Sequence, residues 1–181
     1  IYLVNMLLKN GDNSIKIISK QVPFPLFIYV AGPISASTRG QFNQNIKNLI
    51  EAAKGLIKKG HFVFCPYTSF EFNYKVDSYD FWVCYFDYSW IQRCDAICFV
   101  SGWERSKGAL LEERLAQRID LLRYYPGDEI PELIPELKRL IEENKYRELF
   151  KKIESYNSLS RGERRKILER FANSRILYMR V

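Results

Sequence analysis

Apolar residues in this chain occur in two kinds of stretch: short continuous runs and longer segments with helical spacing. The short runs are rich in β-branched and aromatic residues and stop at glycine, proline or polar residues, which is typical of buried strands. We expect these strands at residues 26–32, 61–67, 95–102 and 119–126. The longer segments place apolar side chains three or four positions apart, as amphipathic helices do. We expect these helices at residues 41–60, 81–94 and 106–118.

The alternation of strands with helices predicts a parallel sheet with right-handed crossovers. We therefore expect an α/β domain over residues 23–126, with a flavodoxin/Rossmann-like parallel sheet and flanking helices. Before it, two apolar runs in residues 1–22 flank an Asn-Gly pair, which indicates a β-hairpin. After it, residues 127–181 are expected to form a basic helical extension with a break at residues 158–163. Residues 175–181 could form a strand that pairs with the hairpin.

The composition is that of a folded domain without a membrane segment. Of the 181 residues, 47% are hydrophobic, which is enough for a sizeable core. No apolar run reaches the roughly 18 residues that span a bilayer. The N-terminal apolar stretch is also too short for a signal peptide. These features predict a soluble, cytoplasmic protein that does not bind membranes.

Cysteine and histidine lack the spacing of a metal site. No two cysteines form a CxxC pair, and the single histidine has no HxxxH partner. The residues are Cys65, Cys84, Cys94, Cys98 and His61. We expect buried free thiols and a chemistry that needs neither a metal nor a cofactor.

The net charge of +7 is concentrated at the C-terminal end. Residues 131–181 carry 13 Lys and Arg against 8 Asp and Glu, a difference of +5, while the first 130 residues carry 15 against 13, a difference of +2. Such a basic extension can attract nucleic acid. A solvated helical face is the alternative, and we favour it because glutamates are interleaved with the cations and no nucleic-acid motif is present.

Acidic side chains near the expected carboxyl edge of the sheet are the candidates for chemistry. Ligands of open parallel sheets bind at this edge. A helix that begins near Ser106 points unpaired N–H groups toward it, and Gly108 allows a ligand to approach closely. Glu112 follows one turn later, and Asp87 lies in the preceding helix. Two carboxylates beside one sugar are the usual apparatus for cleaving a glycosidic bond, although Glu112 alone could be an exposed helical residue.

Four stretches of the chain form a specific combination: IYVAGPIS, GHFVFCP, DYSWIQRCD and SGWERSKGALLEERLA. The combination resembles the nucleoside 2-deoxyribosyltransferase superfamily, in particular the deoxyribosyltransferase-like proteins of phage and prokaryotes. It is also similar to the 2′-deoxynucleoside 5′-monophosphate N-glycosidases. The resemblance covers roughly residues 27–125 and includes the spacing from Asp87 to Asp95 and from Gly108 to Glu112.

The resemblance implies roles for the catalytic candidates. Glu112 matches the family's nucleophile, which attacks C1′ of the sugar. Asp87 matches the carboxylate that donates a proton or orients the sugar. Tyr29 matches the first-strand tyrosine beside the base and sugar, although a core aromatic is the alternative. For Asp95 we favour a structural role, a local hydrogen bond at the edge of its strand.

The resemblance also implies substrate-binding residues. They are Gly32 beside the sugar, Ser106 at a 5′-phosphate, and Gly108 and Trp103 in the Gly-Trp…Ser-x-Gly-Ala signature. In the first loop, Pro33 and Ser35 occupy the places where the N-glycosidases have Ser and Arg, and we expect Ser35 to take part in substrate binding. Ser37, Thr38 or Arg39 could compensate, since Arg is a natural phosphate partner.

The expected chemistry places two demands on the side chains around the sugar. Glu112 should be ionised while Asp87 exchanges a proton, so the two pKa values should separate. Aromatic residues of the loop before the 81–94 helix could stack on a base or could pack in the core. These residues are Phe70, Phe72, Tyr74, Tyr79, Phe81 and Trp82.

The leading hypothesis is an enzyme that cleaves or exchanges the N-glycosidic bond of a nucleoside or nucleoside 5′-monophosphate through a covalent glycosyl-glutamate. A nucleotide-binding sensor on the same scaffold, without turnover, is the second hypothesis, because a fold does not dictate a function. A nucleic-acid-binding protein that uses the basic extension is the third. The resemblance further implies a homodimer or larger homo-oligomer, since a neighbouring subunit often completes the family's site.

Overall fold

The computed structural model describes residues 21–69 and 85–178. The expected hairpin, apart from residues 21 and 22, and the aromatic loop candidates lie outside these residues. The chain divides into two compact units. Among the described residues, the sheet unit contains 26–58, 62–69 and 85–128, and the helical unit contains 21–25, 59–61 and 129–178.

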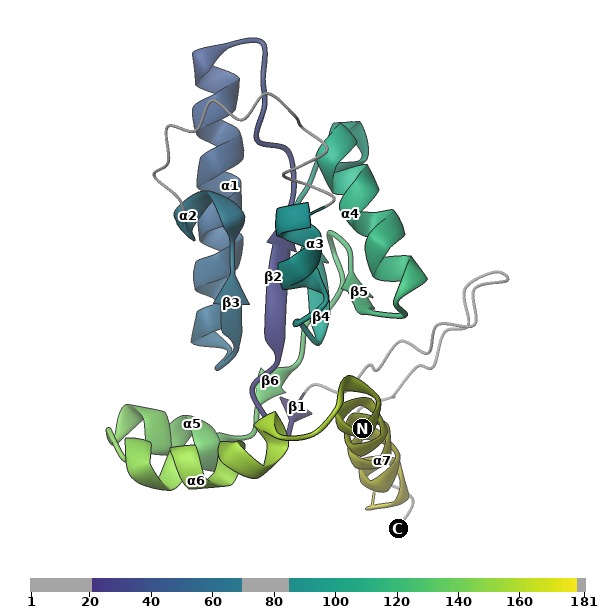
Figure 1. The fold of residues 1–181 in the computed structure, drawn as a ribbon. Coiled ribbons are helices and arrows are strands. Elements are labelled where there is room, and N and C mark those ends of the chain that lie inside the picture. The colour runs from purple at the N-terminus through teal and green to yellow at the C-terminus, as the bar shows by residue number, and fades with distance from the viewer. Residues whose placement is uncertain (1–20, 70–84, 179–181) are drawn as a thin grey trace. The chain divides into compact units, whose positions relative to one another are not determined.

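The sheet unit is built on a four-stranded parallel sheet (Figure 1). Its strands are β2 (Phe27–Ala31), β3 (Phe62–Phe64), β4 (Ala96–Phe99) and β5 (Leu122–Tyr124). They are ordered β3-β2-β4-β5, and each neighbouring pair is parallel. The expected α/β fold with a flavodoxin/Rossmann-like parallel sheet is confirmed, and each of the four strands lies inside its expected range.

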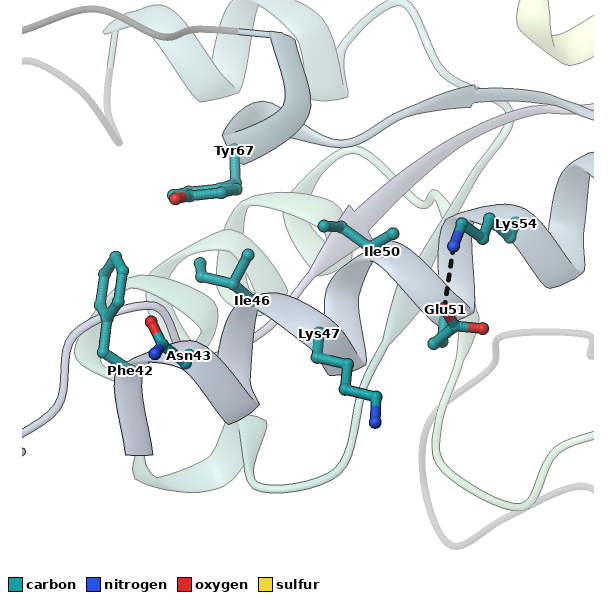
Figure 2. Close-up of a pocket in the computed structure, with 8 residues that line it drawn as sticks. All are labelled: Phe42, Asn43, Ile46, Lys47, Ile50, Glu51, Lys54 and Tyr67. Atoms are coloured by element: carbon teal, nitrogen blue, oxygen red, sulfur yellow. Dashed lines mark hydrogen bonds and ion pairs between the residues drawn. The ribbon is translucent and has the colours of Figure 1, made fainter. Parts of the chain in front are cut away.

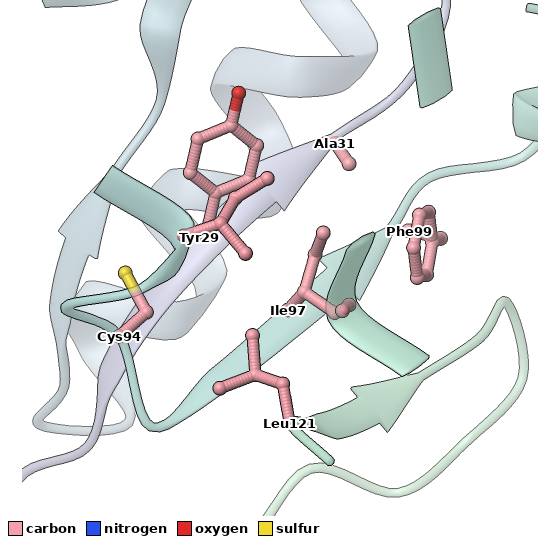
Figure 3. Packing of buried hydrophobic residues seen from close by; sticks show 8 residues of the cluster. Tyr29, Ala31, Cys94, Ile97, Phe99 and Leu121 are labelled. Carbon is pink, nitrogen blue, oxygen red and sulfur yellow. The ribbon is translucent and has the colours of Figure 1, made fainter. Parts of the chain in front are cut away.

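Helices cover both faces of this sheet. They are α1 (Arg39–Lys58), α2 (Pro66–Ser69), α3 (Tyr88–Ile91) and α4 (Lys107–Arg118), with a short 3-10 turn, η2 (Trp103–Arg105). On one face, alternate side chains of β2 and β4 pack with buried residues of α3 and α4, among them Ile91 and Ala116. Figure 3 labels the β2 and β4 side chains of this cluster: Tyr29, Ala31, Ile97 and Phe99. On the other face lies α1, whose Leu49 packs beside Gly32 at the end of β2.

The strand order reverses between β2 and β4. From β2 the chain crosses to β3 on one side, and from β4 it crosses to β5 on the other side. In open α/β sheets the crevice for ligands forms at this reversal, outside the carboxyl ends of the two central strands. The loops that follow β2 and β4 are therefore where a binding site is expected.

The helical unit contains a short parallel pair, β1 (Gln21–Val22) with β6 (Glu132–Leu133), and three helices. The helices are α5 (Pro135–Glu142), α6 (Tyr146–Asn157) and α7 (Arg161–Tyr178). The expected break near residues 158–163 is confirmed, but the pattern missed a second break at Asn144, which has a positive φ of 55°. The expected strand at 175–181 is wrong for residues 175–178, which continue α7.

Residues 59–61 connect α1 to β3 but belong to the helical unit. The Lys59 carbonyl accepts a 2.8 Å hydrogen bond from the Leu133 N–H, and Lys59 Nζ donates to the Ile130 carbonyl at 2.7 Å. His61 Nε2 lies 2.7 Å from the carbonyl oxygen of Pro131. Gly60 has φ 91°, and a Cβ at this position would lie 2.7 Å from the Leu133 Cβ.

Leu133 is also part of the core of the helical unit. It packs with buried leucine and isoleucine side chains of α5 and α6: Leu137, Leu140, Leu149 and Ile153. The strand β6 therefore links residues 59–61 to the packing of two helices. No helix in the described part of the chain is long and apolar enough to cross a membrane.

Two glycine substitutions should shift stability in opposite directions. Gly60→Ala should lower the free energy of unfolding by more than 1 kcal/mol, because an L-residue is strained at this φ and its Cβ meets Leu133. Gly55→Ala should raise it by about 0.5–1 kcal/mol, because Gly55 lies inside α1 with nothing within 4 Å of the added Cβ. Urea denaturation of both variants checks this, and a Gly60→Ala variant as stable as wild type would contradict it.

Candidate active site

A cleft of about 870 Å³ lies at the reversal of strand order. Its walls come from the loop after β2, the loop after β4 and the first turns of α1 and α4. The lining residues are Pro33, Ser35, Ala36, Ser37, Gln41, Asn45, Asn48, Ser101, Gly102, Arg105, Ser106 and Lys107. The volume is within the range of about 300–1,000 Å³ that small-molecule sites occupy.

The catalytic candidates meet on the sheet face that α3 and α4 cover. The Tyr29 hydroxyl, from β2, donates a 2.6 Å hydrogen bond to Oε1 of Glu112 on α4. Both residues are buried; Glu112 is 7% exposed. Glu112 points inward because it shares the buried stripe of α4 with Ala109 and Ala116, at helical spacing. An exposed helical position, the alternative for Glu112, is therefore wrong.

Asp87 belongs to the same cluster. It ends a turn of π-helix at residues 85–87 and directly precedes α3. Asp87 lies near enough to Tyr29 for the tyrosine to lower the pKa of the Asp87 carboxyl. Tyr29 thus interacts with two carboxyl groups, the buried Glu112 on α4 and the half-buried Asp87 at the start of α3.

Burial sets the protonation of this cluster. The pKa of Glu112 is raised to about 8, mainly by burial and secondly by the nearby Asp87 charge. The hydrogen bond from Tyr29 lowers this pKa, but by less than either of these causes raises it. Burial also raises the pKa of Asp87, to about 6. The pKa of Tyr29 lies well above its usual range, because of burial first and the two carboxylates second.

The two pKa values separate as expected, but in the opposite order. We expected Glu112 to be ionised and Asp87 to hold the proton. Glu112 is the more buried group, so the uncharged form is favoured there more strongly than at Asp87. Between about pH 6 and pH 8 the unliganded pair shares one proton, which resides mainly on Glu112.

Two of the expected substrate-binding residues line the cleft. Ser35 comes from the loop after β2, and Ser106 comes from the start of α4. Ser106 is also the N-cap of α4, where its Oγ accepts a 3.3 Å hydrogen bond from the Ala109 N–H. Gly108 is the second residue of α4, inside the first turn.

The other expected substrate-binding residues are not among those that line the cleft. Gly32 is a close-packing position, since a Cβ there would lie 2.3 Å from Val100 Cγ2. Trp103 packs against the rings of Phe99 and Tyr125, with centroids 4.7 and 5.4 Å away. Arg39 is the exposed first residue of α1, while the nearby Ser37 does line the cleft.

The structure adds cleft residues that the sequence pattern did not single out. Arg105 and Lys107 place two cations beside the N-terminus of α4. Asn45 is 5% exposed, and its amide lies 3.5 Å from the carbonyl oxygens of Ile34 and Ser35. An asparagine on the apolar face of an expected helix was the available signal, because a buried amide needs partners. Asn45 therefore holds the first loop of the cleft.

A second pocket, of about 400 Å³, lies between α1 and α2 (Figure 2). Its wall includes the apolar side chains Phe42, Ile46 and Ile50. Its single acid, Glu51, is exposed and bonded to Lys54 at 3.0 Å. This pocket lacks a buried acid, so the Tyr29, Glu112 and Asp87 cluster is the stronger candidate site.

Asp95 and the cysteines have structural positions. Asp95 is buried and accepts a 2.9 Å hydrogen bond from the Phe27 N–H, which ties the start of β4 to the start of β2. Cys65, Cys94 and Cys98 are buried free thiols, as expected. Within the described residues, no group of three or more His, Cys, Asp and Glu side chains is arranged to hold a metal ion.

Comparison with known proteins gives one match. The family model of a domain of unknown function, DUF4406, matches residues 26–124. These residues include all four strands of the sheet, α1, α4 and the three side chains of the carboxyl cluster. No curated protein and no solved structure matches the chain.

Replacing Glu112 with glutamine should stabilise the fold at alkaline pH. The unfolded chain loses the Glu112 proton near pH 4.5, whereas the folded chain retains it up to about pH 8. The contribution of this carboxyl to stability is therefore full below pH 4.5 and falls as the pH rises toward 8. The melting temperature of Glu112→Gln should exceed that of wild type by a margin that grows from pH 5 to pH 8.5.

Glu113→Gln is the matched control for this measurement. Glu113 is the next residue of α4, and it too accepts a hydrogen bond from a tyrosine hydroxyl, that of Tyr125 at 3.1 Å. Its melting temperature should follow the wild-type pH curve. A Glu112→Gln margin that stays constant with pH would contradict the buried, protonated state of Glu112.

Proposed function

The chain belongs to the DUF4406 family, whose description names no function, and we propose from its carboxyl cluster that it cleaves or exchanges an N-glycosidic bond. The substrate is a nucleoside or a nucleoside 5′-monophosphate. The observation that carries the proposal is the 2.6 Å hydrogen bond from Tyr29 to the buried Glu112, with Asp87 near enough to influence both side chains. A buried acid pair with separated pKa values is the arrangement that glycoside cleavage uses.

In the first step, a Glu112 carboxylate oxygen attacks C1′ of the sugar. The C1′–N bond breaks, its electron pair goes to the departing base, and the base nitrogen takes a proton from Asp87. The sugar carries oxocarbenium-like positive charge as the bond breaks, and the carboxylate stabilises that charge before it forms the ester bond. The Tyr29 hydroxyl holds Glu112 in position by its hydrogen bond to Oε1.

In the second step, the Asp87 carboxylate removes a proton from water, and the water oxygen attacks C1′. The bond from C1′ to Glu112 breaks, and the glutamate leaves as a carboxylate. A second base in place of water gives exchange instead of hydrolysis. The reactive form carries the single proton on Asp87, and positive charge developing on the sugar favours this form over the unliganded one, in which Glu112 holds the proton.

The cleft offers a site for a 5′-phosphate. Ser106, Arg105 and Lys107 lie at the N-terminus of α4, where backbone N–H groups and the helix dipole favour an anion. From Ser106 to Glu112 the helix advances roughly 9 Å, at 1.5 Å per residue. A nucleotide with its phosphate at Ser106 could therefore present its sugar to Glu112. These features support a preference for 5′-monophosphates.

We propose further that the protein is a cytoplasmic homodimer or larger homo-oligomer. Support for a subunit contact comes from α6, which exposes Tyr146 by 58% and Phe150 by 63%, one helical turn apart. Binding of nucleic acid by the helical unit is less favoured, because several of its cations pair with glutamates. These pairs are Lys138–Glu132, Lys145–Glu143, Lys152–Glu136 and Arg165–Glu169. Light scattering of the full chain tests the oligomeric state.

A nucleotide sensor without turnover is the second candidate function. The observation that favours it is the raised pKa of Glu112, which keeps the nucleophile protonated at neutral pH in the unliganded site. A sensor would bind the nucleotide in the cleft and would tolerate the loss of Glu112. An enzyme would not, so one substitution separates the two functions.

Glu112→Gln should abolish base release while the protein stays folded. Wild type is first incubated with a panel of nucleosides and nucleoside 5′-monophosphates, and free base is measured by chromatography. With the best substrate, Glu112→Gln should lose at least a hundredfold in rate, because an amide oxygen cannot trap the sugar cation. Glu113→Gln should retain the wild-type rate. A Glu112→Gln rate within tenfold of wild type, about 1.4 kcal/mol of barrier, would refute the nucleophile assignment.

Arg105→Ala should weaken the use of nucleotides more than the use of nucleosides. The lost cation lowers kcat/KM for a 5′-monophosphate by about tenfold or more, as the loss of a charge-assisted hydrogen bond predicts. The value for the corresponding nucleoside should change less than twofold. Equal losses for the two substrates, or equal wild-type kcat/KM for both, would rule out a phosphate at this end of the cleft.

A further inference from the structure

Three aromatic rings form a row beside the carboxyl cluster. Tyr29 of β2 and Phe64 of β3 are register partners in the sheet, and their ring centroids lie 5.7 Å apart. Trp90 of α3 stacks on Phe64 with a centroid distance of 4.3 Å and an interplanar angle of 16°. The row begins at the hydroxyl that holds Glu112 and ends at an indole that is 38% exposed.

Trp90 also stands one helical turn from the acid that donates the proton. Asp87 has helical backbone angles and leads directly into α3, so positions 87 and 90 are three residues apart on a continuous helical path. Residues at this spacing lie on the same side of a helix. A base nitrogen that takes a proton from Asp87 must come within hydrogen-bond reach of that carboxyl, which places the base beside Trp90.

We propose that Trp90 is the platform on which the nucleobase stacks, and so a residue that determines which substrates bind. The proposal rests on the proposed function, since it locates the base from the carboxyl pair. Phe64 supports one side of the indole in a parallel stack and fixes its plane. Trp90 as a whole is 38% exposed, so the ring face opposite Phe64 is the one proposed to meet the base. Base–aromatic stacking is an effective source of affinity.

Trp103, the tryptophan of the Gly-Trp pair, has different surroundings. It packs with Phe99 and Tyr125, which places it against the aromatic packing at the ends of β4 and β5. Of the two tryptophans in the described residues, Trp90 is the one whose ring neighbours lead to Tyr29. These contacts therefore favour Trp90 as the residue that stacks on the base, and they indicate a packing role for Trp103.

The test compares ligands with and without a base. Binding of adenosine 5′-monophosphate, cytidine 5′-monophosphate, their 2′-deoxy forms and ribose 5-phosphate is measured by calorimetry in the Glu112→Gln background, where turnover does not interfere. Trp90→Leu should raise the Kd of the tightest-binding nucleotide by about tenfold or more, the loss expected for one stacked base. It should leave the Kd of ribose 5-phosphate within twofold, because that ligand has no base to stack.

Two further variants keep the result interpretable. Trp90→Phe retains an aromatic ring and should restore nucleotide affinity to within about threefold. Tyr67→Leu removes an aromatic side chain of the same 38% exposure, one that packs edge-on against Phe42, and should leave both Kd values unchanged. If Trp90→Leu weakens ribose 5-phosphate as much as the nucleotide, or weakens neither, Trp90 is a packing residue and the proposal is wrong.

The enzymatic assay separates this proposal from the proposed function. If wild type releases base and Trp90→Leu raises KM for the nucleotide while Trp90→Phe does not, both stand. If wild type releases base but Trp90→Leu leaves KM unchanged, the stacking role fails alone. If wild type binds nucleotides through Trp90 but releases no base from any of them, the proposed cleavage fails and the stacking role stands.

Discussion

The hydrogen bond between the Tyr29 hydroxyl and the Glu112 carboxyl is the contact on which the candidate site depends. It connects the first strand of the sheet to the helix that follows the third strand, two elements separated by 83 residues along the chain. The contact requires that β2 and β4 lie side by side and that α4 return over the face where Tyr29 points. Parallel pairing with right-handed crossovers provides both conditions.

A buried acid at position 112 costs stability, and its burial shifts its pKa into the neutral range. Glu112 lies among side chains that exclude water, so its charged form is disfavoured and its pKa rises to about 8. The charge of nearby Asp87 disfavours a second negative charge at Glu112. The result is a pair that holds one proton near neutral pH, which can move between Glu112 and Asp87. A sheet with an apolar residue in place of Glu112 would avoid this cost and would lack this acid pair.

The helical unit depends on a different constraint. The turn from α1 to β3 adopts a left-handed conformation at Gly60 and is held by hydrogen bonds from Leu133 and Lys59. Leu133 in turn packs with the leucines of α5 and α6. The N-terminal residues 21–25, the turn at 59–61 and the segment after 128 therefore fold as one unit, although they are distant in sequence.

The sequence by itself determined the four strands of the sheet and the helices α1 and α4. Short β-rich runs predicted all four strands of the sheet, and helical spacing predicted α1 and α4, because burial imposes periods of two and 3.6 on the chain. The sequence left open whether Glu112 is exposed, and the structure places it on the buried stripe of α4 with Ala109 and Ala116. The fold class and the nomination of Asp87, Glu112 and Tyr29 needed nothing more than this pattern and a family resemblance.

Only the tertiary structure decided what these residues do to one another. Helical periodicity continues through Asn144, so the break there depends on the packing of α5 against α6. The short strand β6 depends on contacts with residues 59–61, which lie far away in sequence. The order of the two pKa values depends on which carboxyl loses more water, and the sequence does not contain that difference. Trp90 and Trp103 look alike in sequence, but Trp103 packs with Phe99 and Tyr125 while Trp90 stacks on Phe64 in the row that begins at Tyr29. Contacts between elements set these outcomes, because desolvation and stacking depend on neighbours that only folding brings together.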